Sequence, residues 1–216
     1  MLNLDPATIL SRIVILIIAF TFHEFAHAWV ADQFGDNTPR QAGRLTLNPV
    51  AHLDLMGSLM LLVAGFGWAK PVPVNPYALQ RSSPSARMWV SVAGPGSNLI
   101  LAILAAIPFR MGLIKFSLAS NSLFPTPFSF LFEFIIINLS LMLFNLIPIA
   151  PLDGKEVLSY FLPESWSRKL DVIQPYGPII LLVLVFLGPT LGINVLSWVM
   201  TPALTGIMRL LVGGVV

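Results

Sequence analysis

The sequence contains no cysteine and few charged residues. Without cysteine no disulfide framework can form, although this absence does not identify a cellular compartment. Charged residues make up 10% of the 216 positions, whereas a soluble domain carries about 25%. The net charge is +2 and the 12 lysines and arginines are scattered, which excludes nucleic acid as a partner. The remainder is apolar, with 56% hydrophobic residues and a mean hydropathy of +0.83. This balance predicts an integral membrane protein.

Four apolar segments are long enough to cross a bilayer, at about residues 7–31, 88–109, 128–148 and 176–199. Each approaches or exceeds the roughly 20 residues that a ~30 Å hydrocarbon core requires. The first lacks the small-residue cleavage site of a signal peptide, so we expect it to be retained. The tail at 201–216 is apolar but short and is expected at the membrane interface. We predict one all-α polytopic membrane domain over residues 1–216.

The segment HLDLMGSLMLLVAGFG, residues 52–67, either spans the membrane or re-enters it. Its apolar core of about 13 residues favours a re-entrant segment. If it spans, the lysines and arginines divide 7 to 5 between the two sides; if it re-enters, they divide 8 to 4. The positive-inside rule therefore also favours re-entry, with the N-terminus outside. The flanking stretches GRLTLNP and KPVPVNP alternate like strands, so small interfacial β elements are expected around residues 43–76, with interfacial loops as the alternative.

The first apolar segment carries a metal-binding pattern, FHEFAH, in which His23 and His27 are separated by one helical turn. Both imidazoles then project from one helix face, as two ligands of a tetrahedral Zn²⁺ would. Glu24 points about 100° away and could exchange a proton with a zinc-bound water, whose pKa falls towards ~7. Ionisable groups in a membrane helix each cost at least ~2.5 kcal/mol, so a chance occurrence of this spacing is the poorer explanation.

A hydrolytic zinc site needs a third protein ligand and an open position. Asp153 and His52 are the two candidates. Asp153 follows two prolines, Pro148 and Pro151, that end the third predicted span. A broken helix at membrane depth is tolerated only against protein or a wet cavity, so Asp153 is the preferred ligand and His52 the alternative.

The depth of the histidines predicts how the helices run. His23 is about 16 residues into the first helix, or ~24 Å from its entry side, and Asp153 follows the exit end of the third. The two can meet only if these helices are parallel, as the re-entrant arrangement makes them. Asn145, near the proline break, and Asn98, in AGPGSN, either bind substrate backbone or make interhelical contacts.

Several motifs together resemble one family. FHEFAHAWVADQFGD, GRLTLNPVAHLD, KPVPVNP, AGPGSN and NLIPIAPLDG occur in the order found in site-2 proteases, which are zinc metalloproteases that cleave within membranes. The resemblance covers about residues 15–160. It implies that His23, His27 and Asp153 bind one Zn²⁺, that Glu24 is the catalytic acid/base, and that Asn145 assists substrate binding. It also implies a three-helix core with the metal towards the cytoplasmic side.

The sequence departs from the family pattern after Gly154, where Lys155 and Glu156 replace the common Gly-Arg. No PDZ or CBS domain is expected either. We predict an intramembrane zinc endopeptidase in a prokaryotic cell membrane, acting on transmembrane substrates in regulated intramembrane proteolysis. The alternatives are a metal-ion transporter, which would not need Glu24, and a non-catalytic metal-binding scaffold.

Overall fold

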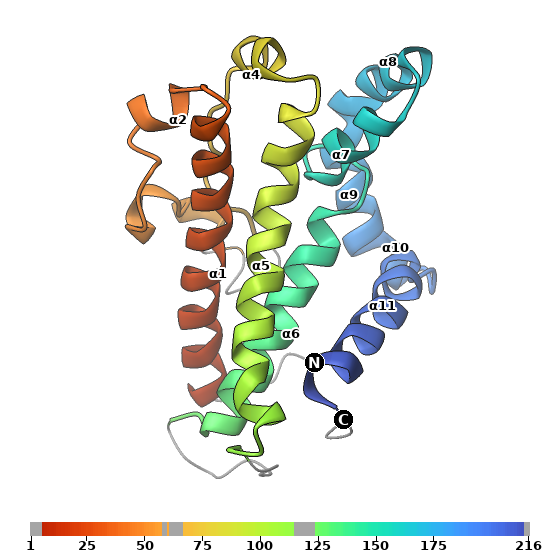
Figure 1. The fold of residues 1–216 in the computed structure, drawn as a ribbon. Helices are drawn as coiled ribbons and strands as arrows, with labels where there is room; N and C mark the ends of the chain where they lie inside the picture. Colours follow the sequence, from red (N-terminus) through yellow and green to blue (C-terminus); the bar gives the residue numbers. More distant parts are fainter. Residues whose placement is uncertain (1–5, 58–59, 61–66, 115–123, 214–216) are drawn as a thin grey trace.

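Three long helices form the centre of the molecule. The computed structural model describes residues 6–57, 60, 67–114 and 124–213. Helices α1 (Pro6–Gln33), α5 (Ala86–Arg110) and α6 (Pro127–Asn145) lie side by side, with α5 packed against both α1 and α6 (Figure 1). They correspond to the first three predicted spans, at 7–31, 88–109 and 128–148, so the three-helix core is confirmed.

Helices α1 and α6 are parallel, and α5 runs against them. Near one end, Arg12 of α1 pairs with Glu133 of α6 at 2.7 Å. Near the other end, His23 of α1 lies 3.3 Å from Asp153, which follows α6. The parallel order predicted from the depth of His23 is therefore confirmed. We call the end of the bundle that holds Asp153 the metal end.

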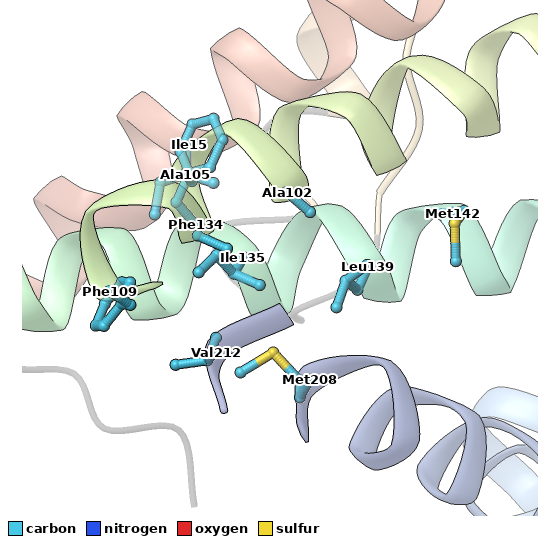
Figure 2. Packing of buried hydrophobic residues seen from close by; sticks show 11 residues of the cluster. Ile15, Ala102, Ala105, Phe109, Phe134, Ile135, Leu139, Met142, Met208 and Val212 are labelled. Atoms are coloured by element: carbon cyan, nitrogen blue, oxygen red, sulfur yellow. The ribbon is translucent and has the colours of Figure 1, made fainter. Parts of the chain in front are cut away.

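The core between these helices combines small apolar side chains from α5 with larger ones, several of them from α6 (Figure 2). Helix α5 contributes Ala102, Ala105 and Ala106, whose short side chains let the neighbouring helices approach closely. Several large residues on α5, among them Ile103 and Leu104, are exposed, whereas Phe109 is buried in the core. A helix that is apolar all round and exposes its larger side chains fits a lipid surround.

The limits of α6 follow from its flanking residues. The Thr126 hydroxyl caps the helix by accepting a hydrogen bond from the Ser129 N–H, and Pro127 occupies its first position. Helix α6 ends at Asn145, three residues before the predicted limit of 148. Proline disfavours the helical conformation in the residue before it, so Pro148 acts already on Ile147.

The C-terminal half differs from the prediction. The helical run consists of α7 (Gly154–Phe161), α8 (Glu164–Ile173), a 3₁₀ turn (Gln174–Tyr176), α9 (Gly177–Leu182), a π-helical turn (Val183–Leu187), α10 (Gly188–Thr190) and α11 (Val195–Val212). A fourth helical run long enough to span is therefore confirmed, but its expected limits of 176–199 are wrong. Gly192, with a left-handed φ of 77°, interrupts the helix at residues 191–194. The tail predicted to start at 201 belongs, as far as Val212, to α11.

The segments on either side of this break are both long and apolar. Within the described part of the chain, five helical segments are long and apolar enough to span a membrane. Two of them are Glu164–Thr190 and Val195–Val212. Asp171 of α8 pairs with Lys155 at the metal end. At the opposite end, Arg110 of α5 donates hydrogen bonds to the carbonyl groups of Leu210 and Leu211, which close the last turn of α11. Together α8–α11 thus extend from one end of the bundle to the other (Figure 1).

The region between α1 and α5 is mostly irregular. It contains α2 (Thr38–Gln41), a 3₁₀ turn (Pro49–Ala51) and α4 (Pro76–Ser82). The expected β elements at 43–76 are not confirmed: where the structure describes this region, it holds a single antiparallel bridge, between Leu53 and Ala69. Residues 58–59 and 61–66 of the predicted re-entrant segment lie outside the described residues, so re-entry stays a prediction.

Candidate metal centre

Three of the predicted site residues meet at the metal end. His23 and His27 come from one face of α1, and Asp153 comes from the turn after α6. The Nε2 atoms of the two histidines are 3.0 Å apart, and Oδ2 of Asp153 lies 3.3 Å from the first and 3.4 Å from the second. The sequence motif placed the two histidines together; the fold adds a carboxylate 126 residues beyond His27 (153 minus 27).

The hydrogen bonds of the two Nδ1 atoms determine which nitrogen of each ring carries the proton and which keeps its lone pair. Nδ1 of His27 lies 2.7 Å from the Val90 carbonyl, which can only accept a hydrogen bond. Nδ1 of His23 lies 2.7 Å from Oδ1 of Asn98. Both Nδ1 atoms therefore carry the proton, and both Nε2 lone pairs face the Asp153 carboxylate. Three acceptors this close repel one another unless a positive charge lies between them.

The three atoms fit a zinc ion. Bonds of ~2.0–2.2 Å at tetrahedral angles would separate the ligand atoms by about 3.3–3.6 Å, close to the observed 3.0, 3.3 and 3.4 Å. Oδ2 of Asp153 is buried and has no hydrogen-bond partner in the described part of the chain. A buried, unpaired carboxylate oxygen is costly, and a cation would compensate it. Nitrogen and oxygen ligands of this kind are those that zinc uses.

Two glycines make room for the group. A Cβ at Gly94 of α5 would overlap the ring nitrogens of both histidines. Gly94 therefore lets α5 pass directly behind the rings, which bond Val90 and Asn98 on either side of it. A Cβ at Gly154 would overlap the Leu146 and Ile147 carbonyls. The turn from α6 into α7 can therefore fold tightly enough to bring Asp153 to the histidines.

Glu24 is buried beside this group without belonging to it. It forms an ion pair with Arg44, whose Nη2 lies 4.0 Å from Oε2 of Glu24. Glu24 lies on α1 together with the two histidines and is not one of the three grouped residues; its role as the acid/base stays a prediction. Arg44 was not predicted as a site residue, because only the path of the loop after α2 brings it there.

Asn98 has no exposed surface, and its side chain is hydrogen-bonded to His23. It is therefore not placed to contact a substrate directly. Its Oδ1 atom accepts from His23, while Nδ2 donates to Oδ1 of Asn138 at 3.0 Å and to the Ala19 carbonyl at 3.4 Å. Nδ2 of Asn138 in turn donates to the Phe134 carbonyl of its own helix at 2.9 Å. These bonds connect α6, α5 and α1. Asn138 was missed at the sequence level because an asparagine in an apolar helix gives no sign of its partner.

The remaining two candidates lie elsewhere. His52, the alternative ligand, is fully buried, but its Nε2 donates to the Thr46 carbonyl at 2.7 Å and it is not among the three grouped residues. Asn145 is half-buried at the end of α6 and donates from Nδ2 to the Leu141 carbonyl at 3.0 Å. Within the described residues, no hydrogen bond to Oδ1 of Asn145 is present.

Comparison with known proteins identifies related sequences. The model of the family described as "Peptidase family M50" matches residues 11–113 and 110–187. The Bacillus subtilis protein named "Putative zinc metalloprotease YwhC" is 43% identical over 202 residues, which cover 92% of this chain and 88% of that protein. The "Putative zinc metalloprotease Rip2" of Mycolicibacterium smegmatis is 33% identical over 176 residues, 78% of this chain and 63% of that protein. The "Putative zinc metalloprotease Rip2" of Mycobacterium tuberculosis (strain H37Rv) is 34% identical over 181 residues, which cover 82% of this chain and 66% of that protein. No solved structure matches significantly.

Proposed function

The chain belongs to peptidase family M50, the site-2 protease family of zinc metalloproteases, and we propose that it hydrolyses peptide bonds in or near the transmembrane segments of other membrane proteins. The observation that carries the proposal is the place of the His23–His27–Asp153 group. Its ligands come from α1 and from the turn after α6, two helices long and apolar enough to span a membrane. A metal centre formed there can act on peptide bonds at membrane depth.

We assign His23, His27 and Asp153 as the ligands of one Zn²⁺ and Glu24 as the catalytic acid/base. Zinc bound there would supply the Lewis acidity that activates a water and polarises the scissile carbonyl. The Glu24 carboxylate would take the proton from the attacking water and deliver it to the leaving amine. Val90 and Asn98 hold the two imidazoles in the tautomer that presents Nε2.

The substrate must reach the site in extended form, because the backbone of a helix hides its carbonyl groups within its own hydrogen bonds. We propose that extended backbone in the 43–76 region and Asn145 receive the unwound segment. Residues 70–75 are irregular and follow Ala69, which forms the bridge with Leu53. The N–H groups of Val72 and Val74 have no hydrogen bond among the described residues, so they could pair with an added chain. Oδ1 of Asn145 would accept a hydrogen bond from a substrate N–H.

We further propose that the metal end faces the cytoplasm and that the N-terminus is outside. The charge division of 8 to 4 supports this orientation. The chain has no cysteine, so single-cysteine variants test it directly. Cysteine at exposed Ser82, the last residue of α4, should react with an impermeant reagent only in inverted vesicles. Cysteine at exposed Leu113, beyond α5, should react only in intact cells. The opposite pattern would reverse the orientation.

The decisive experiment compares the wild-type protein with Glu24→Gln on a panel of single-span peptides in the presence of zinc. We expect cleavage by the wild type, no cleavage by Glu24→Gln, and equal zinc content in both. Full cleavage by Glu24→Gln would remove the proposed mechanism. Zinc flux across vesicles, spared in Glu24→Gln and without peptide cleavage by either protein, would identify a transporter instead.

A further inference from the structure

Arg44 is a buried cation beside the proposed acid/base, and no step assigned so far uses it. It lies in the loop after α2, outside the apolar helices, and its side chain is 4% exposed. The nearest carboxylate is that of Glu24, with Nη2 4.0 Å from Oε2. A charged group is rarely buried to this extent unless it is paired.

The contacts of Arg44 differ from those of an arginine that only supports its loop. Arg40, four residues earlier, is exposed and forms two close hydrogen bonds with Asp32, at 2.9 and 2.7 Å. Arg44 makes no such bond with Glu24, and its Nε is buried without a hydrogen-bond partner among the described residues. Burial lowers the pKa of Arg44, an effect that the charge of Glu24 opposes, yet arginine stays protonated. Burying the charged guanidinium of Arg44 therefore costs free energy.

Hydrogen bonds hold both the guanidinium and the backbone of Arg44 in place. Nη2 of Arg44 donates to the Lys70 carbonyl, and the Lys70 N–H donates to the His52 carbonyl at 2.8 Å. The buried His52 ring in turn donates to the Thr46 carbonyl, two residues beyond Arg44. The Arg44 N–H itself donates to the Pro39 carbonyl at 2.8 Å. This closed set of bonds gives His52 a role in holding the loop that carries Arg44.

We propose that Arg44 is a positioning residue for Glu24. At 4.0 Å the two groups attract each other but do not form a hydrogen bond. The charge of Arg44 thus restrains the Glu24 carboxylate without occupying the oxygen that has to receive the proton. A closer pair, such as Arg40 with Asp32, would hold the carboxylate in hydrogen bonds that the reaction must break. This inference deepens the proposed function and rests on it.

The test compares two glutamine substitutions in the full-length protein, Arg44→Gln and Arg40→Gln, with a single-span peptide as substrate. Both arginines lie in the same short segment and pair with a carboxylate of α1. We expect Arg44→Gln to lower kcat by about 10- to 100-fold, with unchanged KM and zinc content. Arg40→Gln should keep the wild-type kcat. Arg44→Lys should fall between them, because its ammonium keeps the charge but not the planar fork.

Three results would overturn the inference. The first is a kcat for Arg44→Gln within about twofold of that for Arg40→Gln. The second is a loss of kcat in Arg44→Gln that is matched by a loss of zinc, which would make Arg44 structural. The third, where Arg44→Gln fails to fold, is a wild-type kcat for Arg44→Met, which also lacks the charge. If the wild type and Arg40→Gln are both inactive, the proposed function fails instead.

A binding measurement shows whether Arg44 acts through Glu24. A peptide hydroxamate, which chelates zinc and contacts the acid/base carboxylate, serves as the probe. Its affinity is measured for the wild type, Glu24→Gln, Arg44→Gln and the double variant. We expect the effect of Arg44→Gln to be at least about fivefold smaller in the Glu24→Gln background, because the two act as a pair. Equal effects in both backgrounds would contradict the inference.

Discussion

At the scale of single residues, the metal centre depends on what lies behind its ligands. The Val90 carbonyl and the Asn98 amide oxygen each fix the tautomer of one histidine. Without these bonds either ring nitrogen could carry the proton, and the pair would offer its lone pairs in one direction only part of the time. The residues that orient the rings therefore contribute to metal affinity although none of them is a ligand.

Asn98→Ala should weaken zinc binding by about 10- to 100-fold, because the His23 ring loses the acceptor that fixes it. The measurement is a zinc titration against a competing chelator. Asn138→Ala is the matched control: it is equally buried but bonds Asn98 and not a histidine. It should weaken zinc binding less. Equal losses would mean that cavity formation, and not ring orientation, is responsible.

Gly94→Ala should abolish zinc binding, since the added methyl group would overlap the nitrogens of both His23 and His27. Zinc content after purification and peptide cleavage are the measurements. Gly96→Ala, on the same helix, has open space at its Cβ, so it should keep zinc and stabilise the helix by about 0.5–1 kcal/mol. A zinc-bound, active Gly94→Ala protein would contradict the predicted overlap.

The three residues that meet at the metal end could be named from the sequence, but the residues that support them could not. A His-x-x-x-His spacing and a proline-broken helix before Asp153 are local patterns. The contact of Gly94 with two rings depends on how closely α5 passes α1, and that distance is set by the packing of Ala102, Ala105 and Ala106 far along the helix. Arg44 depends on the path of a loop. Neither can be read from spacing alone.

At the scale of elements, the turn that carries Asp153 is tied to two other helices. Lys155, which replaces the glycine usual in the family, is buried and pairs with Asp171 of α8 at 2.7 Å and with Glu156 at 3.1 Å. Glu156 pairs with Arg87 of α5 at 2.7 Å. Burial disfavours the charge of Lys155, but these carboxylates outweigh it and raise its pKa. The departure from the family pattern thus joins α7 to α8 and α5.

Asp171→Asn should lower the free energy of unfolding by about 1–2 kcal/mol, because it leaves the buried ammonium of Lys155 with one partner. Thermal unfolding in detergent measures this loss. Glu164→Gln is the control: its pair with Arg168 on the same helix is exposed, so it should cost less than about 0.5 kcal/mol. If Asp171→Asn lowered the free energy of unfolding no more than Glu164→Gln does, the link from Lys155 to α8 would not contribute to stability.

The pH dependence of this link follows from the raised pKa of Lys155. Its folded-state pKa lies above the unfolded value, so its contribution to stability is fully present below the unfolded pKa of about 10.4. The contribution is lost only as the pH rises through the folded-state pKa. The difference in unfolding midpoint between the wild type and Lys155→Met should therefore be constant around pH 7 and shrink at alkaline pH. A difference that shrinks between pH 6 and 8 would contradict this assignment.

The C-terminal elements show why helix limits could not be predicted from hydropathy. Residues 176–199 form one apolar run, yet the chain bends at Gly192 and α11 continues to Val212. Met208 and Val212 are buried in the core against α5 and α6, and Arg110 closes the end of the helix. These are contacts between distant segments. A window of apolar residues contains no information about them.

At the scale of the whole molecule, the metal group joins the first long helix to the turn after the third. Zinc would therefore stabilise the arrangement of α1 and α6, and not one helix alone. A ligand that binds only the folded state stabilises it according to its concentration. The Arg12–Glu133 pair connects the same two helices near the opposite end, so the two contacts fix both ends of the parallel pair.

Removal of zinc by a chelator should lower the thermal midpoint of the wild type, since free zinc at 1,000 times its Kd contributes about 4 kcal/mol. Readdition of zinc should restore it. Glu24→Gln keeps all three ligands and should respond like the wild type, whereas Asp153→Asn should respond little. An Asp153→Asn protein that gains as much from zinc as the wild type would exclude Asp153 as a ligand.

The distance along the chain between His27 and Asp153 also sets the order of events during synthesis. His27, the later of the two histidines, leaves the ribosome 126 residues (153 minus 27) before Asp153 does. Helix α1 therefore enters the membrane with an incomplete ligand set, and the site is completed only after α5 and α6 have been inserted. Under the proposed ligand assignment, a nascent chain that ends before Asp153 cannot complete the zinc site, so zinc would bind and peptide cleavage would begin only after this turn has been made.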